Sequence, residues 1–123
     1  MLASIFRRMG GIALLLIALV PATADGQEIK VTLLGTGTPP PAMNRFGPSI
    51  LVEAGGQTFL FDAGRGALQR LAQLGIRWQE VDGVFLTHLH SDHVVGFPDL
   101  WLTGWLVNPG RDRPLPVWGP RGT

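Results

Sequence analysis

The chain has 123 residues, which allows at most one folded domain. Ten Lys and Arg residues stand against nine Asp and Glu residues, so the net charge of +1 gives no indication of a strongly basic nucleic-acid-binding protein. No cysteine is present, which excludes a disulfide framework and any metal site built from thiolates.

The first 24 residues have the pattern of a secretory signal peptide. Arg7 and Arg8 supply a basic start, residues 12–20 an apolar core, and Ala22-Thr23-Ala24 a small-residue cleavage site. The apolar core is about ten residues long, whereas a membrane-spanning helix needs roughly 20. We therefore predict export to the periplasm or medium, with residues 25–123 as the mature segment and no membrane span in it. Removal of the two leader arginines leaves eight basic residues against nine acidic ones.

Three strands are expected early in the mature segment, at residues 29–34, 49–53 and 58–61, because apolar and β-branched residues gather there. The first two are separated by residues 35–47, where three glycines and three successive prolines predict a loop. The last two are joined across residues 54–57, Ala-Gly-Gly-Gln, which predicts a hairpin.

The second part of the segment alternates helix and strand. Residues 65–74 carry apolar side chains spaced i, i+3, i+4 and i+7, which predicts an amphipathic helix that ends at Gly75. A buried strand is expected at 84–87, a short helix at 100–107 and a last strand at 115–118. This order of elements predicts α/β layering.

All three histidines of the chain lie within six residues, His88-Leu89-His90-Ser91-Asp92-His93. Imidazole nitrogens and carboxylate oxygens are ligands that zinc prefers. If the preceding strand extends to Thr87, its backbone turns the rings of His88 and His90 to the same side. Asp92 and His93 can then face a second point, so the cluster predicts a metal site and favours a pair of ions. The alternative for Asp92 is an N-cap of a helix that begins at His93.

This cluster resembles the H-x-H-x-D-H signature of the metallo-β-lactamase superfamily, which follows a strand. The likeness extends along residues 29–123. Residues 33–39 are similar to the first strand and loop of the ribonuclease Z and arylsulfatase-like branch, residues 61–64 to the first motif of the superfamily, residues 93–98 to the continuation of the signature, and residues 117–123 to a later glycine-rich strand end. The resemblance implies an αββα sandwich, of which this chain holds the N-terminal half only.

By this resemblance, His88 and His90 bind a first metal ion, and Asp92 and His93 bind a second. Asp92 is also the position that accepts a proton during hydrolysis. The implied cofactor is Zn²⁺, two ions per complete domain, which hold a shared water as hydroxide near neutral pH. The superfamily adds a third His to the first metal, a bridging Asp and another His to the second metal, and none of these follows His93.

Asp62 lies in the first motif, at the end of an expected strand. The resemblance implies that its carboxylate accepts a hydrogen bond from a ligand histidine and so fixes the tautomer and the ring angle. The alternative is a place in the N-cap region of the helix near Arg65, and the two roles are compatible.

Two further groups of residues have less specific interpretations. Trp101 and Trp105 share a face of the expected helix, and core or lid packing is their first interpretation, with substrate lining as the alternative. The arginines of the last loops, Arg111, Arg113 and Arg121, are interpreted as solvated charges, with attraction of an anionic substrate as the alternative.

The resemblance implies an exported metal-dependent hydrolase that cleaves a phosphoric, sulfuric or other ester with a metal-activated water. We expect a small anionic ester as substrate and no nucleic-acid partner, because the leader directs the chain away from transfer RNA and Ser91 stands where ribonuclease Z sequences usually carry Gly. The alternatives are a ribonuclease Z-like phosphodiesterase acting on RNA and a non-catalytic metal-binding remnant. Residues 25–123 are expected to be a truncated part of the domain and inactive alone.

Overall fold

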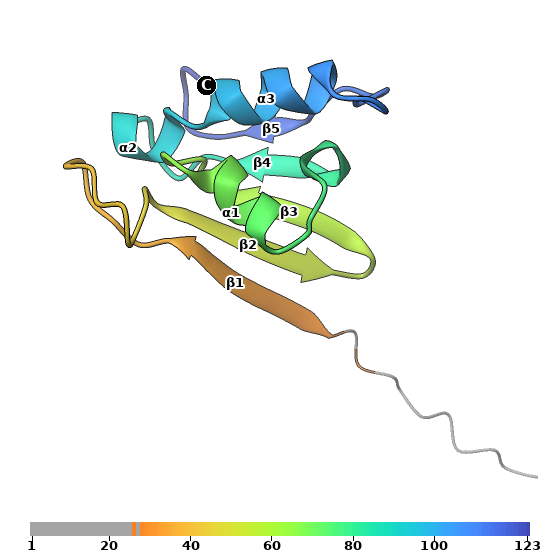
Figure 1. Ribbon diagram of the computed structural model, residues 1–123, viewed down its shortest axis with the longest axis horizontal. Helices are drawn as coiled ribbons and strands as arrows, with labels where there is room; N and C mark the ends of the chain where they lie inside the picture. Colours follow the sequence, from red (N-terminus) through yellow and green to blue (C-terminus); the bar gives the residue numbers. More distant parts are fainter. Residues whose placement is uncertain (1–25, 27) are drawn as a thin grey trace, which may run out of the picture.

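The computed structural model describes residue 26 and residues 28–123, so the predicted leader lies outside the described residues. Five strands form one sheet in the order β1-β2-β3-β4-β5 (Figure 1). The strands are β1 (Ile29–Gly35), β2 (Ser49–Ala54), β3 (Gln57–Phe61), β4 (Gly83–Phe85) and β5 (Val117–Trp118). The helices are α1 (Ala67–Gln73), the 3₁₀ turn η1 (Trp78–Glu80), α2 (Ser91–Val94) and α3 (Phe97–Leu106). No helix in this part of the chain has both the length and the apolar character needed to cross a bilayer.

The pairing of the strands confirms the predicted hairpin and the predicted α/β layering. β1, β2 and β3 are antiparallel neighbours, and Ala54 pairs with Gln57 at the tip of the β2–β3 hairpin. Gly55 and Gly56 form that tip with φ angles of 57° and 75°, which glycine adopts without steric cost. β4 then lies parallel to β3, and β5 lies parallel to β4. The connection between these two parallel strands runs through α1. It places β4, and the histidine cluster that follows β4, beside the end of β3.

Several element boundaries differ by a few residues from the sequence-based expectation, among them the start of α3 at Phe97 and of β5 at Val117, and two of the differences have a local physical reason. Helix α1 begins at Ala67, not at residue 65, because Gly66 has a φ of 86° and interrupts the helical backbone. Strand β4 ends at Phe85, not at Thr87, because the backbone N–H of Thr87 bonds to the side chain of Asp62 instead of a neighbouring strand.

The hydrophobic core lies on one face of the sheet. Leu51, Leu60 and Val84 lie side by side on β2, β3 and β4, and each is fully buried. Leu71 from α1 and Leu100 from α3 pack against them and are equally buried. Figure 1 shows both helices on the same side of the sheet, with the loop after β1 and helix α2 together at one end of it. This α/β arrangement with helices on one face is the one expected for the N-terminal half of the sandwich.

The opposite face of the sheet, here called the open face, is also apolar. One row across it runs through paired positions of all five strands: Leu33, Ile50, Phe61, Phe85 and Trp118. The ring of Phe85 stacks between those of Phe61 and Trp118, with centroid distances of 4.8 and 4.7 Å. Leu33 is 63% exposed. An apolar sheet face of this extent is a surface on which another layer packs.

The two tryptophans of α3 are not part of the core. Trp101 and Trp105 are 50% and 66% exposed, so the interpretation of these rings as core packing is wrong for the described part of the chain. Leu100 and Gly104 make the buried contacts of the helix instead.

The arginines of the loop after α3 tie that loop to the sheet. Arg111 donates hydrogen bonds to the carbonyl oxygens of Val81 and Trp78, at 2.7 and 2.8 Å. Arg113 forms an ion pair with Asp82 at 2.6 Å. Both guanidinium groups are therefore engaged in structural contacts within the protein.

The ion pair at Asp82 makes stability depend on pH in acid. Burial alone raises the pKa of Asp82, but the backbone N–H of Thr58 and the Arg113 guanidinium outweigh it and lower the pKa below its usual value. Because the pKa is lower in the folded state, the ionised carboxylate stabilises the fold at pH values above the unfolded pKa of about 3.9. This stabilisation is lost as the pH falls through the folded pKa. We therefore expect the Tm of the chain to fall below about pH 4, and to fall less in Asp82→Asn, as measured by circular dichroism. An equal fall of Tm with decreasing pH in the parent protein and in Asp82→Asn would contradict this account.

Candidate metal centre

Asp62 is placed by a strained turn at the end of β3. Its φ is 60°, a left-handed conformation that Asp tolerates better than most residues. Its backbone is fixed on both sides, because its N–H donates to the carbonyl of Phe85 at 2.8 Å and its carbonyl accepts from the Ser49 hydroxyl at 2.9 Å. The side chain is almost fully buried and points toward the segment that follows β4.

The carboxylate of Asp62 accepts hydrogen bonds from two residues of that segment. Oδ1 accepts from the backbone N–H of Thr87 at 2.8 Å, and Oδ2 accepts from the Thr87 hydroxyl at 2.8 Å. Oδ2 also lies 2.7 Å from Nδ1 of His93. Helix α1 has no side-chain cap, so Asp62 contacts His93 and Thr87 and does not serve as an N-cap.

Two glycines let the turn after β3 pack directly on helix α2. Ala63 donates its N–H to the carbonyl of His93 at 2.7 Å and accepts from the N–H of Gly96 at 2.8 Å. A Cβ at Gly64 would lie 2.5 Å from the Asp92 carbonyl oxygen, and one at Gly96 would lie 2.3 Å from that of Gly64. This close approach holds Asp62 against the histidine cluster.

The structure brings the four residues predicted as metal ligands together at one end of the sheet. Nε2 of His88 lies 3.1 Å from Nδ1 of His90, and the rings of His88 and His93 have centroids 3.9 Å apart. A carboxylate oxygen of Asp92 lies 3.7 Å from Nε2 of His93. Asp92 is buried at 6% exposure, in the first turn of α2, whose N-cap position is His90. No side chain caps α2, so the N-cap alternative for Asp92 is wrong.

The hydrogen bonds assign the protons of two of the histidines. Nδ1 of His93 lies 2.7 Å from Oδ2 of Asp62, and in the neutral tautomer that donates from Nδ1 the lone pair is on Nε2. The Thr87 hydroxyl donates to Asp62, so it accepts from Nδ1 of His88, 3.0 Å away. In the neutral tautomer of His88 that donates from Nδ1, the lone pair is on Nε2, 3.1 Å from Nδ1 of His90. One buried carboxylate thus orients two imidazoles, one directly and one through Thr87.

Thr87 is a residue of the candidate site that sequence reasoning missed. We expected it to be the last residue of a strand, whereas its N–H and hydroxyl both bind Asp62. The available signal was a hydroxyl residue directly before the first histidine, 25 positions from the aspartate that it contacts.

The donor set fits part of a zinc centre. Neutral imidazole nitrogens and a carboxylate are suitable ligands, and the lone pairs on Nε2 of His88 and His93 are set as a metal requires. Within residues 28–123, however, no three His, Asp or Glu side chains are arranged around a single point. A catalytic zinc takes three protein ligands. The described residues therefore supply pairs of donors, and a complete centre needs more ligands than these.

Comparison with known proteins gives one matching family and relatives that are named ribonuclease Z. The family described as anti-Pycsar protein Apyc1 matches residues 29–112. Ribonuclease Z of Mycolicibacterium gilvum is 54% identical over 96 residues, and that of Mycobacterium marinum is 53% identical, each covering 77% of this chain. The chain spans 34% of the length of these curated relatives, about a third.

Solved structures agree on the fold. The short form of human tRNase Z matches with a TM-score of 0.66 and 34% identity, over 75% of this chain and 34% of that one. The metallo-β-lactamase fold protein YhfI from Bacillus subtilis matches with a TM-score of 0.69 and 27% identity, over 76% of this chain and 39% of that one. Neighbours with this fold imply a metal cofactor.

These relatives correct one prediction. The expectation of a small anionic ester as substrate and of no nucleic-acid partner is wrong, because the similar proteins are named ribonuclease Z and tRNase Z. The expectation depended on the leader and on Ser91. Ser91 lies exposed at the start of α2, and the predicted leader lies outside the described residues.

The strand-end histidine cluster, the aspartate behind it and the relatives together identify the lineage. The chain belongs to the metallo-β-lactamase superfamily, in its ribonuclease Z branch and within the family described as anti-Pycsar protein Apyc1, of which it represents an N-terminal portion.

Proposed function

We propose that this chain is the N-terminal part of a metal-dependent phosphodiesterase that acts on RNA. The observation that carries the proposal is the 54% identity to a ribonuclease Z over 96 residues. A stretch of that length in a chain of 123 must include residues 88–93. The alternative of an RNA-acting enzyme is therefore better supported than the hydrolysis of small esters.

The geometry supports a separate proposed role for each residue of the cluster. His88 and His93, oriented by Asp62, offer Nε2 to metal, and His90 and Asp92 complete the two pairs. Two zinc ions are the proposed cofactor, and when bound they supply an activated water and stabilise charge on the phosphate. Asp92 is the proposed proton acceptor, since its buried carboxylate lies beside the cluster.

The test is hydrolysis by the longer protein that the length of the relatives implies. Purified with zinc, it is expected to cleave precursor transfer RNA, to lose this activity on chelation and to regain it when zinc is added back. Aryl sulfates serve as the comparison substrate. Cleavage of aryl sulfates without any cleavage of RNA would contradict the proposal, as would full RNA cleavage after complete removal of metal.

Export remains a separate prediction, because residues 1–24 lie outside the described part of the chain. Amino-terminal sequencing of the protein from cell fractions tests it. The leader pattern predicts a periplasmic form that begins at residue 25, and a cytoplasmic form, which action on precursor transfer RNA requires, would contradict export.

A further inference from the structure

Three arginines beside the metal cluster have no carboxylate partner. In the described chain, the Lys30, Arg77 and Arg113 side chains each pair with an acid. Arg45, Arg65 and Arg70, here called the arginine patch, form no such pair, and Arg45 and Arg65 are exposed. Like charges gathered without neutralisation create a positive potential that attracts an anion.

The fold holds these arginines together through the loop after β1. The N–H of Gly47 donates to the carbonyl of Arg65 at 2.8 Å, which fixes the loop on the turn before α1. Phe46 lies against Gly66 and under the guanidinium of Arg70, whose central carbon is 4.6 Å from the ring centroid. This stacking is a favourable cation–π arrangement and positions Arg70 beside the loop.

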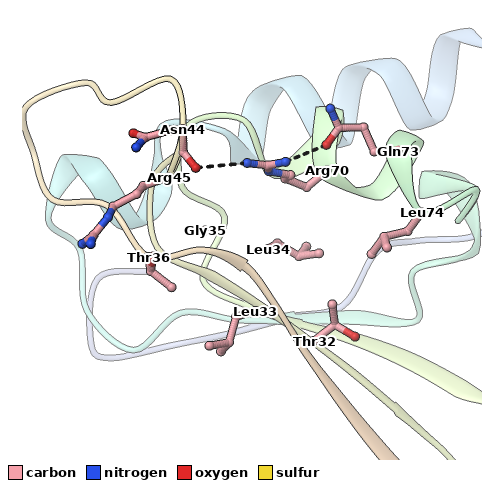
Figure 2. Close-up of a pocket in the computed structure, with 10 residues that line it drawn as sticks. All are labelled: Thr32, Leu33, Leu34, Gly35, Thr36, Asn44, Arg45, Arg70, Gln73 and Leu74. Carbon is pink, nitrogen blue, oxygen red and sulfur yellow. Dashed lines mark hydrogen bonds between the residues drawn. The ribbon is translucent and has the colours of Figure 1, made fainter.

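A pocket of about 340 Å³ opens between this loop, α1 and the free edge of β1. Arg70 reaches across it between Gln73 and Asn44, donating to the side chain of the first at 2.8 Å and to the carbonyl of the second at 3.5 Å (Figure 2). Arg45 lines the same pocket from the loop. Leucines line part of this opening, and neutral polar groups and two guanidinium groups line the rest, with no carboxylate among the lining residues. Guanidinium groups can bind the oxygens of a phosphate with paired hydrogen bonds.

The patch begins next to the metal cluster. Gly64, the residue before Arg65, packs on the backbone of Asp92, and a Cβ placed on Gly47 would lie 3.0 Å from the Asp92 carbonyl oxygen. Consecutive Cα atoms are about 3.8 Å apart, so the backbone of Arg65 lies one residue step from this contact. The backbone that carries Arg65 therefore lies within reach of phosphates next to a bond held at the cluster.

We propose that the arginine patch binds backbone phosphates of the RNA strand next to the bond that is cleaved. This inference rests on the proposed function and adds the path of the substrate, along the loop after β1 and the start of α1. Guanidinium contacts to phosphate position a strand without selecting its sequence. The patch thus explains how a site with two small groups of ligands can hold a long substrate in register.

The test uses the longer, zinc-loaded protein and the double variant Arg65→Gln, Arg70→Gln. Its matched control is Arg77→Gln with Arg113→Gln, which removes the same charge away from the cluster. Binding of a fluorescein-labelled single-stranded RNA is measured by anisotropy against salt concentration. The patch variant is expected to raise the Kd at least about tenfold. The salt slope, which is the slope of log Kd against log salt concentration, is expected to fall by about 1.4, since each of the two lost phosphate contacts removes about 0.7. The control is expected to change neither.

A second readout separates this inference from the proposed function. kcat/KM for RNA is expected to fall by a larger factor than kcat/KM for bis(p-nitrophenyl) phosphate in the patch variant. An unchanged salt slope and Kd, with RNA cleavage intact, would overturn the patch alone. Arginine-dependent RNA binding without RNA cleavage in the parent protein would overturn the proposed function alone. If polyglutamate displaced the labelled RNA as well as unlabelled RNA does, the patch would bind acidic protein as readily as RNA, and this result would also overturn the patch.

Folding is checked by the Tm of each variant. Because Arg70 stacks on Phe46, Arg70→Lys with Arg65→Lys is included, which keeps the charge and loses the planar guanidinium groups. Recovery of the salt slope in this pair is expected. A slope that stays low despite a parental Tm would contradict a role of charge.

Discussion

Replacing Asp62 with Ala is expected to weaken metal binding by the longer protein roughly 10–100-fold, because the buried carboxylate orients two imidazoles. The same change leaves Nδ1 of His93 and the backbone N–H of Thr87 without their acceptor. An unsatisfied buried donor costs about 1–3 kcal/mol, so we expect a loss of about 3 kcal/mol in the free energy of unfolding. That is a large part of the total of about 5–15 kcal/mol for a small domain.

Two further substitutions at this position separate charge from backbone conformation. Asp62→Asn tolerates the φ of 60° and can still accept from the N–H of Thr87, but it lacks the charge that holds the protonated Nδ1 of His93. Asp62→Gly relieves any strain of the left-handed backbone and removes the side chain. Zinc titration against a competing chelator should rank affinity as Asp, then Asn, then Gly and Ala. Parental affinity in the Gly variant would contradict a role of the carboxylate.

The ligand residues were predictable because they are close in sequence. His88, His90 and His93 lie within six positions, and a turn of any type brings such neighbours near each other. The contact between Asp62 and His93 spans 31 positions. It was expected only from the resemblance, since no local pattern indicates that the end of β3 lies beside the segment after β4. Which elements lie side by side in a parallel pair is decided by tertiary packing.

Two of the errors concern what surrounds an element. Periodicity shows that an element has an apolar face, but not which neighbour covers it. The spacing of Trp101 and Trp105 therefore leaves core packing, lid packing and substrate lining open, and the structure excludes the core because the helix buries Leu100 and Gly104 instead. Strand β4 is shorter than expected for a different reason, because apolar character continues to Leu86 while the N–H of Thr87 binds the Asp62 carboxylate.

Replacing Leu60 with Ala is expected to lower the free energy of unfolding of the chain by about 2–5 kcal/mol. Leu60 is fully buried at the centre of the sheet, where β3 meets Leu51 of β2 and Val84 of β4, so its loss leaves a cavity that rigid strands on both sides cannot close. The matched control is Leu33→Ala, the same change on the open face, where the side chain is 63% exposed. It is expected to cost less than about 1 kcal/mol. Urea denaturation gives both values, and a similar cost at the two sites would contradict the assignment of the core to the helix-covered face.

The same control variant tests what covers the open face in the longer protein that we propose. A second sheet packed there would bury Leu33 with the row of Phe61, Phe85 and Trp118, so that Leu33→Ala would then cost about 2 kcal/mol or more. The cost of Leu60→Ala should remain in its original range, because its surroundings lie on the other side of the sheet. A Leu33→Ala cost below about 1 kcal/mol in both forms would show that this face stays exposed to solvent. The stability difference between the two forms thus measures the packing of the layer that completes the sandwich, independently of metal and of catalysis.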